Sequence, residues 1–76
     1  MNIEVIEWWD AVAGAEWTTT PLDIDLCVTV GKVAFEDDRR VVLAPTWSRD
    51  HFNNQMAIPK GWIKSRRTHD IGPCEA

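Results

Sequence analysis

The stretch DLCVTVGKVAFEDDRRVVLAP, residues 25–45, restricts the fold of this 76-residue chain more than any other segment. Its apolar residues alternate with polar or small ones, which is the pattern of a strand with one buried face. The apolar positions change parity after Gly31, so we expect a β-bulge at this glycine that keeps both sets on one face. The side chains expected to face the core are Leu26, Val28, Val30, Val33 and Phe35.

The turn between the two strands of this stretch is expected to have an odd number of residues. An odd-length turn, either EDDRR or DDR, pairs Phe35 with Val41. It also pairs Val33 with Leu43, so that all four apolar side chains point toward the core. A turn of even length would instead place Phe35 opposite Arg40, because a one-residue slip moves every side chain to the other face.

The remaining segments predict further short strands joined by turns. Residues 3–8 contain β-branched and aromatic types in loose alternation and predict the first strand. Residues 46–55 have no periodicity and many turn formers, so we expect a long loop. MAIP, residues 56–59, predicts another strand, and a tight turn then leads to a last short strand that contains Ile63.

About five short strands without a convincing helix predict an all-β fold. We expect a small five-stranded SH3-like or Sm-like barrel that forms a single domain over residues 1–67. An OB-like barrel is the alternative, which is less favoured because that fold usually has an extra helix and more residues. Residues 68–76 are polar and interrupted by glycine and proline, and we expect them to form a poorly ordered tail.

Three of the five tryptophans lie in EWWDAVAGAEW, residues 7–17. A domain of this size buries only about 60% of the surface that its unfolded chain exposes, so its core needs large side chains. Trp8 and Trp17 are expected to close one end of the barrel. Trp9 is one position out of phase with Trp8 and should face outward. So many large aromatics in so small a shell also predict a homo-oligomer.

The charges are segregated along the chain, although the net charge is only −4. Residues 1–38 contain nine carboxylates and one lysine, whereas residues 39–69 contain seven basic residues and one aspartate. The two cysteines, Cys27 and Cys74, are far apart in the sequence and do not predict a disulfide framework. An acidic N-terminal segment and the lack of a long apolar run predict neither a cleaved signal nor a membrane span. We therefore expect a cytoplasmic protein.

The sequence contains no pattern that is typical of an enzyme or of a cofactor site. His51 and His69 lie in the expected loop and tail, without a metal-ligand spacing, a C-x-x-C pair or a glycine-rich phosphate motif. Asp10 and Glu16 could approach each other as an acid/base pair, but a capping aspartate and an exposed glutamate explain them more simply. We expect no catalytic activity, no metal and no cofactor.

Binding without catalysis is the function class that we favour, because tryptophan, phenylalanine and arginine are enriched at binding interfaces. The alternative is a module for single-stranded nucleic acid, since KGWIKSRR alternates cations with an indole that can stack on a base. An isoelectric point of about 4.9 argues against that alternative. The residues expected to bind a ligand or partner are Trp9, Trp47, Phe52, Trp62, Lys64, Arg66 and Arg67.

Several short motifs together resemble small β-barrel accessory proteins encoded by bacteriophages. The resemblance covers about residues 3–65 and implies a phage accessory protein in the host cytoplasm. Such a protein would act in host takeover or defence evasion, by binding a host protein or by sequestering a nucleotide-type signal. The motifs are W-x-D-A (Trp8, Asp10, Ala11) with Trp17, V-G (Val30, Gly31), E-D (Glu36, Asp37), V-x-L-A (Val41, Leu43, Ala44) and I-P-x-G-x-I-K (Ile58, Pro59, Gly61, Ile63, Lys64).

Overall fold

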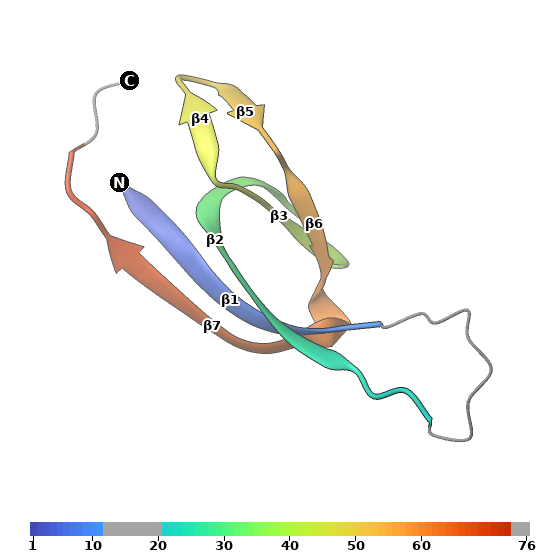
Figure 1. The fold of residues 1–76 in the computed structure, drawn as a ribbon. Coiled ribbons are helices and arrows are strands. Elements are labelled where there is room, and N and C mark those ends of the chain that lie inside the picture. Colours follow the sequence, from blue (N-terminus) through green and yellow to red (C-terminus); the bar gives the residue numbers. More distant parts are fainter. Residues whose placement is uncertain (12–20, 74–76) are drawn as a thin grey trace.

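The computed structural model describes residues 1–11 and 21–73, and it confirms the all-β class (Figure 1). From β2 onward the strands join through short turns, and one 3₁₀ turn precedes the last strand. The elements are β1 (Asn2–Asp10), β2 (Asp25–Glu36), β3 (Arg40–Ala44), β4 (Thr46–Ser48), β5 (His51–Asn53), β6 (Met56–Pro59), the 3₁₀ turn η1 (Lys60–Trp62) and β7 (Ile63–Asp70).

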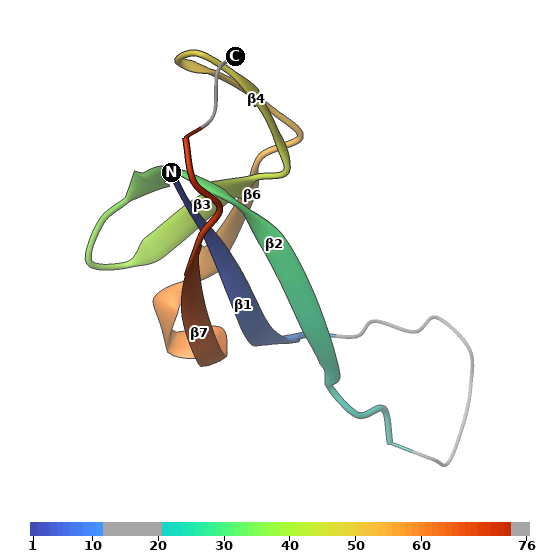
Figure 2. The same cartoon turned by 90° about the vertical axis from the view of Figure 1, so that its left-hand side faces the viewer.

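Five strands form one antiparallel sheet in the order β6-β3-β2-β1-β7. The first strand thus lies between β2 and the last strand, and the curled sheet has β6 at one edge and β7 at the other (Figures 1 and 2). A single 3₁₀ turn, η1, precedes the last strand of this sheet. No backbone ladder joins β6 to β7 within the described residues, so the sheet is an open roll rather than the closed barrel expected from the sequence.

The core lies on the concave face of the sheet. From β1 this face receives Ile6 and Trp8, and the Trp8 indole nitrogen donates a hydrogen bond to Thr29 Oγ1 at 3.0 Å. Trp8 is only 7% exposed, as the tryptophan pattern predicted. The hydrophobic cluster consists of Ile6, Trp8, Val41, Leu43 and Ile58, with Cys27, Val33 and Ile63 packed against it.

The expectation that Leu26, Val28 and Val30 face the core is wrong. All three are exposed, and Val28 reaches 60%. The other face of β2 points inward and carries small residues, because the large β1 side chains opposite them already fill the core: Trp8 pairs with Cys27. Alternation therefore identified the strand correctly but assigned its two faces the wrong way round.

Gly31 does not lie at a bulge, contrary to expectation. The β1–β2 register is continuous as far as the pair Glu4–Gly31, and Gly31 is buried beside the end of β3. A Cβ atom on this glycine would lie 2.5 Å from the backbone carbonyl oxygen of Ala44. Glycine occurs within strands either at bulges or where two backbones approach each other closely. Gly31 is of the second kind.

The register shift occurs farther along, between Val33 and Phe35. The expected pair of Val33 with Leu43 is confirmed. The expected odd-length turn is wrong: three residues separate the ends of β2 and β3, but Glu36 pairs with Val41, so the turn between paired residues has an even number of residues. Phe35 instead pairs with Val42 and is 48% exposed, so its predicted inward orientation is wrong. The centre of its ring lies 4.9 Å from the guanidinium carbon of Arg40, within the range of a cation–π contact.

Two further segments differ from the sequence-based expectation. Residues 46–55 contain a small hairpin, β4–β5, instead of only a loop, and the aromatic pair Trp47–Phe52 faces across it. The last strand continues to Asp70, which pairs with Asn2, so residues 68–70 belong to the sheet and not to a disordered tail. Trp17 and Cys74 lie outside the described residues.

Candidate functional site

Two exposed indoles flank a cavity at the end of the roll where β1 finishes and η1 begins. Trp9 is 38% exposed and Trp62 is 45% exposed. Together with Ile24 they line an open cavity of about 290 Å³, whose remaining lining is Asp10, Ala11 and Gly61. The ammonium of Lys64 lies 5.6 Å from the centre of the Trp9 ring. The arrangement is a mainly apolar cavity with one carboxylate and one cation near its rim.

Local backbone geometry places each indole of this site. Strand alternation sends Trp8 into the core and turns Trp9 outward, as expected. Pro59 ends β6 in an extended conformation, and the 3₁₀ turn that follows carries Trp62 without burying it. The first residue of β7, Ile63, pairs with Trp8 across a bulge, which brings the turn beside the end of β1.

A second aromatic site lies at the opposite end of the roll, on the β4–β5 hairpin (Figure 1). Trp47 and Phe52 are half-buried, and the Lys32 ammonium lies 5.9 Å and 5.8 Å from their ring centres. Because this cation already lies over both rings, less of the ring surface is left for a ligand to contact. This hairpin is therefore a less open site than the Trp9–Trp62 cavity.

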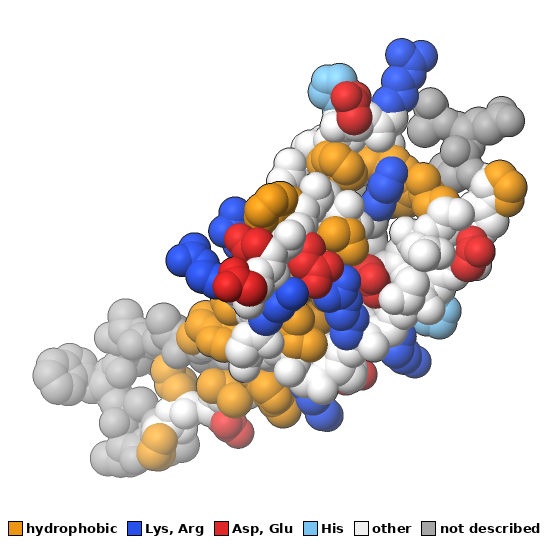
Figure 3. Space-filling model, turned by 180° about the vertical axis from the view of Figure 1, so that it is seen from behind, with side chains coloured by type: hydrophobic (Ala, Val, Ile, Leu, Met, Phe, Trp, Pro, Cys, Tyr) orange, Lys and Arg blue, Asp and Glu red, His pale blue; other side chains and the backbone are white. Residues whose placement is uncertain are grey.

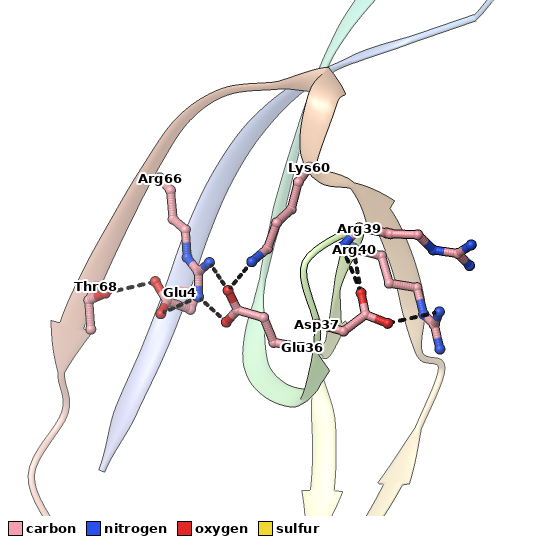
Figure 4. Close-up of polar contacts among 8 residues, drawn as sticks. All are labelled: Glu4, Glu36, Asp37, Arg39, Arg40, Lys60, Arg66 and Thr68. Atoms are coloured by element: carbon pink, nitrogen blue, oxygen red, sulfur yellow. Dashed lines mark hydrogen bonds and ion pairs between the residues drawn. The ribbon is translucent and has the colours of Figure 1, made fainter.

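An ionic network joins β7 and η1 to β1 and to the end of β2 (Figure 4). Glu36, at the end of β2, accepts two 2.9 Å hydrogen bonds from Arg66 of β7 and pairs with Lys60 of η1 at 2.9 Å. Arg66 also pairs with Glu4 at 3.2 Å, and Thr68 donates to Glu4 at 2.8 Å. Glu4 is buried, and these two partners satisfy its carboxylate.

The network changes the titration of its members. Hydrogen bonds from Arg66, and then from Lys60, lower the pKa of Glu36 to about 2. Hydrogen bonds to Glu36 and Glu4 raise the pKa of the Arg66 guanidinium above its ordinary value. Arg66 is thus a structural residue of the roll.

On the face in Figure 3, acidic and basic side chains lie interleaved across the middle, and hydrophobic side chains gather on both sides of them.

We expect the stability of the protein to fall as the pH decreases from about 4.5 toward about 2. The folded pKa of Glu36 lies below its unfolded value of 4.5, so its stabilising contribution is complete above that value and is lost on protonation of the folded state. Thermal melts across this range should show a smaller pH dependence for Glu36→Gln. Asp38→Asn, an exposed neighbour on the same hairpin, should retain the wild-type dependence. Equal slopes for wild type and Glu36→Gln would contradict the assignment.

The residues predicted from the sequence to bind a ligand therefore separate into two aromatic sites and two separate arginines. Trp9, Trp62 and Lys64 meet at one site, and Trp47 and Phe52 form the hairpin pair. Arg66 is held by two carboxylates. Arg67 is exposed on β7 opposite Val5.

Sequence reasoning missed Ile24 as a lining residue of the cavity, and it missed the network carboxylates Glu4 and Glu36. Ile24 precedes β2 in the stretch PLDID, where no periodicity marks it as part of a site. Glu4 stands in an alternating strand, where an acidic residue is normally assigned to the solvent face. Its partners Arg66 and Thr68 are more than sixty positions away, and no local pattern relates them.

Within the part of the chain that the structure describes, no three His, Cys, Asp or Glu residues are grouped so as to hold a metal ion. None of the described residues forms a helix that is long and apolar enough to cross a membrane. Comparison of the chain with protein-family models, with curated proteins and with solved structures gave no match.

Proposed function

We propose that this protein is a non-enzymatic binding protein that takes an apolar or aromatic side chain of a partner protein into the Trp9–Trp62 cavity. The observation that carries the proposal is the pair of exposed indoles that face a cavity of about 290 Å³. Exposed tryptophans beside a concave apolar surface are the residues that most often dominate the energy of a protein interface. Burial of such rings by a partner releases water from both surfaces.

The polar groups around the cavity fit a protein partner better than a nucleotide. Asp10 lines one part of the cavity, and Lys64 rests against the Trp9 ring. One cation and one carboxylate beside an apolar centre form the polar rim that protein interfaces have. A phosphate would need several free cations, yet Arg66 is already paired with Glu4 and Glu36.

The same pairing weakens the case for single-stranded nucleic acid. Within KGWIKSRR, the cations of Lys60 and Arg66 both bind Glu36, so this segment does not present a continuous basic surface. Lys64 and Arg67 are its remaining cations. Nucleic-acid binding depends on several simultaneous phosphate contacts and therefore receives little support from this geometry.

The motif resemblance supports the biological setting of the proposal. As a phage accessory protein in the host cytoplasm, the chain would act in host takeover or defence evasion by occupying a host protein. The choice of a host protein over a nucleotide signal rests on the apolar cavity and on the engagement of Arg66.

The proposal is tested by capture of host proteins on the wild type, on Trp62→Ala and on Trp47→Ala, followed by calorimetry with the purified captured protein. We expect wild type and Trp47→Ala to bind equally, because Trp47 lies at the other end of the roll. Trp62→Ala should bind at least about tenfold more weakly, as expected for loss of a central aromatic contact. Equal binding by all three proteins would overturn the proposal. So would tight, salt-dependent binding to single-stranded oligonucleotides without a protein partner.

A further inference from the structure

The first half of β2 has a backbone edge that no other described strand pairs with. Residues 25–31 pair with β1, whereas β3 pairs with β2 only from Lys32 onward. Figure 2 shows β1 along one side of this half of the strand. The edge ends at Gly31, because the backbone of Ala44 lies against that residue. We call residues 26–30 the β2 edge. Unpaired N–H and C=O groups along a strand edge can bind a strand of another chain.

The composition of the β2 edge favours pairing with another strand. Its sequence, LCVTV, contains no charged residue, no proline and no glycine, and three of its five residues are β-branched. Leu26, Val28 and Val30 are exposed, all on the outer face of the strand. Proteins normally pair or cover a hydrophobic edge of this kind. The β2 edge contributes no residue to the lining of the Trp9–Trp62 cavity, so it is a separate surface.

The two outermost strands of the sheet, in contrast, have features that oppose pairing. β7 carries Lys64, Arg66 and Arg67 among its eight residues. β6 has only four residues and ends in Pro59, which has no N–H group to donate. Charged side chains, short length and proline are the means by which proteins prevent the pairing of edge strands. The β2 edge has none of the three, so it is the best suited of these edges for association.

We propose that the occupant of the β2 edge is the β2 edge of a second copy, paired antiparallel about a two-fold axis at Val28. This register places Val28 opposite Val28, Leu26 opposite Val30 and Cys27 opposite Thr29. Every apolar residue of the outer face then lies about 5 Å from an apolar residue of the other copy. The two sheets join into one continuous sheet, with the two β2 strands side by side at its centre.

The charges along β2 are compatible with this pairing. Asp25, the charged residue next to the edge, lies opposite Gly31 of the second copy, so no two like charges oppose each other. A two-fold ladder needs the same run of residues on both sides. The run that leaves the edge unprotected therefore also supplies its partner, whereas a strand of another protein would have to compete with it.

The size of the contact indicates a weak and reversible dimer. The ladder has five residue pairs, which correspond to about 17 Å of strand. Such a contact is smaller than the roughly 800 Å² per partner of a standard interface. We therefore expect a dissociation constant on the order of 10 μM, at which the dimer forms and dissociates with protein concentration.

Hydrogen exchange of the wild type, followed by NMR at about 20 and about 500 μM protein, tests the backbone pairing directly. Alternate amides of the β2 edge, those that point away from β1, should exchange several-fold more slowly at the higher concentration. Amides of β7 should exchange at the same rate at both concentrations. Equal rates for the β2 edge would overturn the proposal: slow exchange at both would mean that the edge is covered within one copy, and fast exchange at both that it stays unpaired.

Sedimentation equilibrium from about 1 to about 200 μM protein measures the association itself. The mass of the wild type should change from 8.7 kDa toward twice that value. Val28→Lys should weaken association at least about tenfold, because two lysines oppose each other at the axis. Ile71→Lys adds the same charge at an exposed apolar residue outside the edge and should associate like the wild type. A wild type that remains at 8.7 kDa, or equal association of the two variants, would overturn the proposal. If Val28→Lys does not fold, the exchange measurement decides without a variant.

The same variants separate this proposal from the proposed function. Trp62→Ala should dimerise like the wild type, because Trp62 lies outside the β2 edge. Val28→Lys should still bind the captured host protein, because Val28 does not line the Trp9–Trp62 cavity. A monomeric wild type whose binding to the host protein is lost in Val28→Lys would show that a foreign strand occupies the edge. That result would overturn the dimer and leave the test of Trp62 unaffected.

Discussion

A Gly31→Ala variant is expected to be largely unfolded at 25 °C, with a loss of about 3 kcal/mol or more in the free energy of unfolding. The added Cβ would lie 2.5 Å from the Ala44 carbonyl oxygen and 2.7 Å from its carbon. Both are backbone atoms, so no rotamer change relieves the contact. Relief requires β2 and β3 to move apart where Lys32 pairs with Ala44, beside the buried pair of Val33 and Leu43.

Urea unfolding followed by tryptophan fluorescence measures this effect, and Gly61→Ala is the matched control. A Cβ on Gly61 meets nothing within 4 Å, so its replacement should be neutral or slightly stabilising. A Gly31→Ala midpoint as high as that of Gly61→Ala would show that the backbones of β2 and β3 leave room for a Cβ atom at Gly31.

The second large effect is expected at Trp8, with its chain neighbour as the control. Trp8→Ala should cost about 3–5 kcal/mol, because it leaves a large cavity in the core. It also leaves the Thr29 hydroxyl without its indole donor. Trp9→Ala should cost about 1 kcal/mol or less, since this ring is partly exposed and loses mainly its contact with Lys64.

Thermal melts and chemical denaturation of the two variants measure the difference directly. Trp8→Phe should give an intermediate result, because it retains most of the buried volume but not the hydrogen bond. If Trp9→Ala were as destabilising as Trp8→Ala, Trp9 would be a core residue. The Trp9–Trp62 cavity would then lose its role as a binding site.

These two tryptophans also show which parts of the structure a sequence can predict. Strand alternation is a local property, so the inward Trp8 and outward Trp9 followed from their adjacency in a predicted strand. The pair Val33–Leu43 was predicted from apolar spacing and is present in the structure, although the turn is of even length and a register shift before Phe35 restores the pair. Each of these inferences needed only residues that are near one another in the chain.

The orientation of β2 could not be predicted in this way. Alternation distinguishes two faces but does not say which one the core occupies, and the more apolar face was the natural choice. In the structure, the large side chains Ile6 and Trp8 of β1 lie opposite Thr29 and Cys27 of β2, so this part of β2 contributes smaller residues to the core. The Trp9–Trp62 cavity likewise depends on where η1 meets β1, which follows from tertiary packing and not from any local pattern.

The pairing of the first strand with the last one has a consequence for how quickly the protein folds. Asn2 pairs with Asp70, and β1 lies between β2 and β7, so half of its ladder cannot form until the far end of the chain arrives. Bringing such distant segments together costs loop-closure entropy, and this cost comes before any contact between the two strands stabilises the chain. Refolding is therefore expected on a timescale of roughly milliseconds to seconds, slower than for helical domains of equal length. During that interval the apolar β2 stays exposed, and dilute conditions should favour the native chain over aggregates.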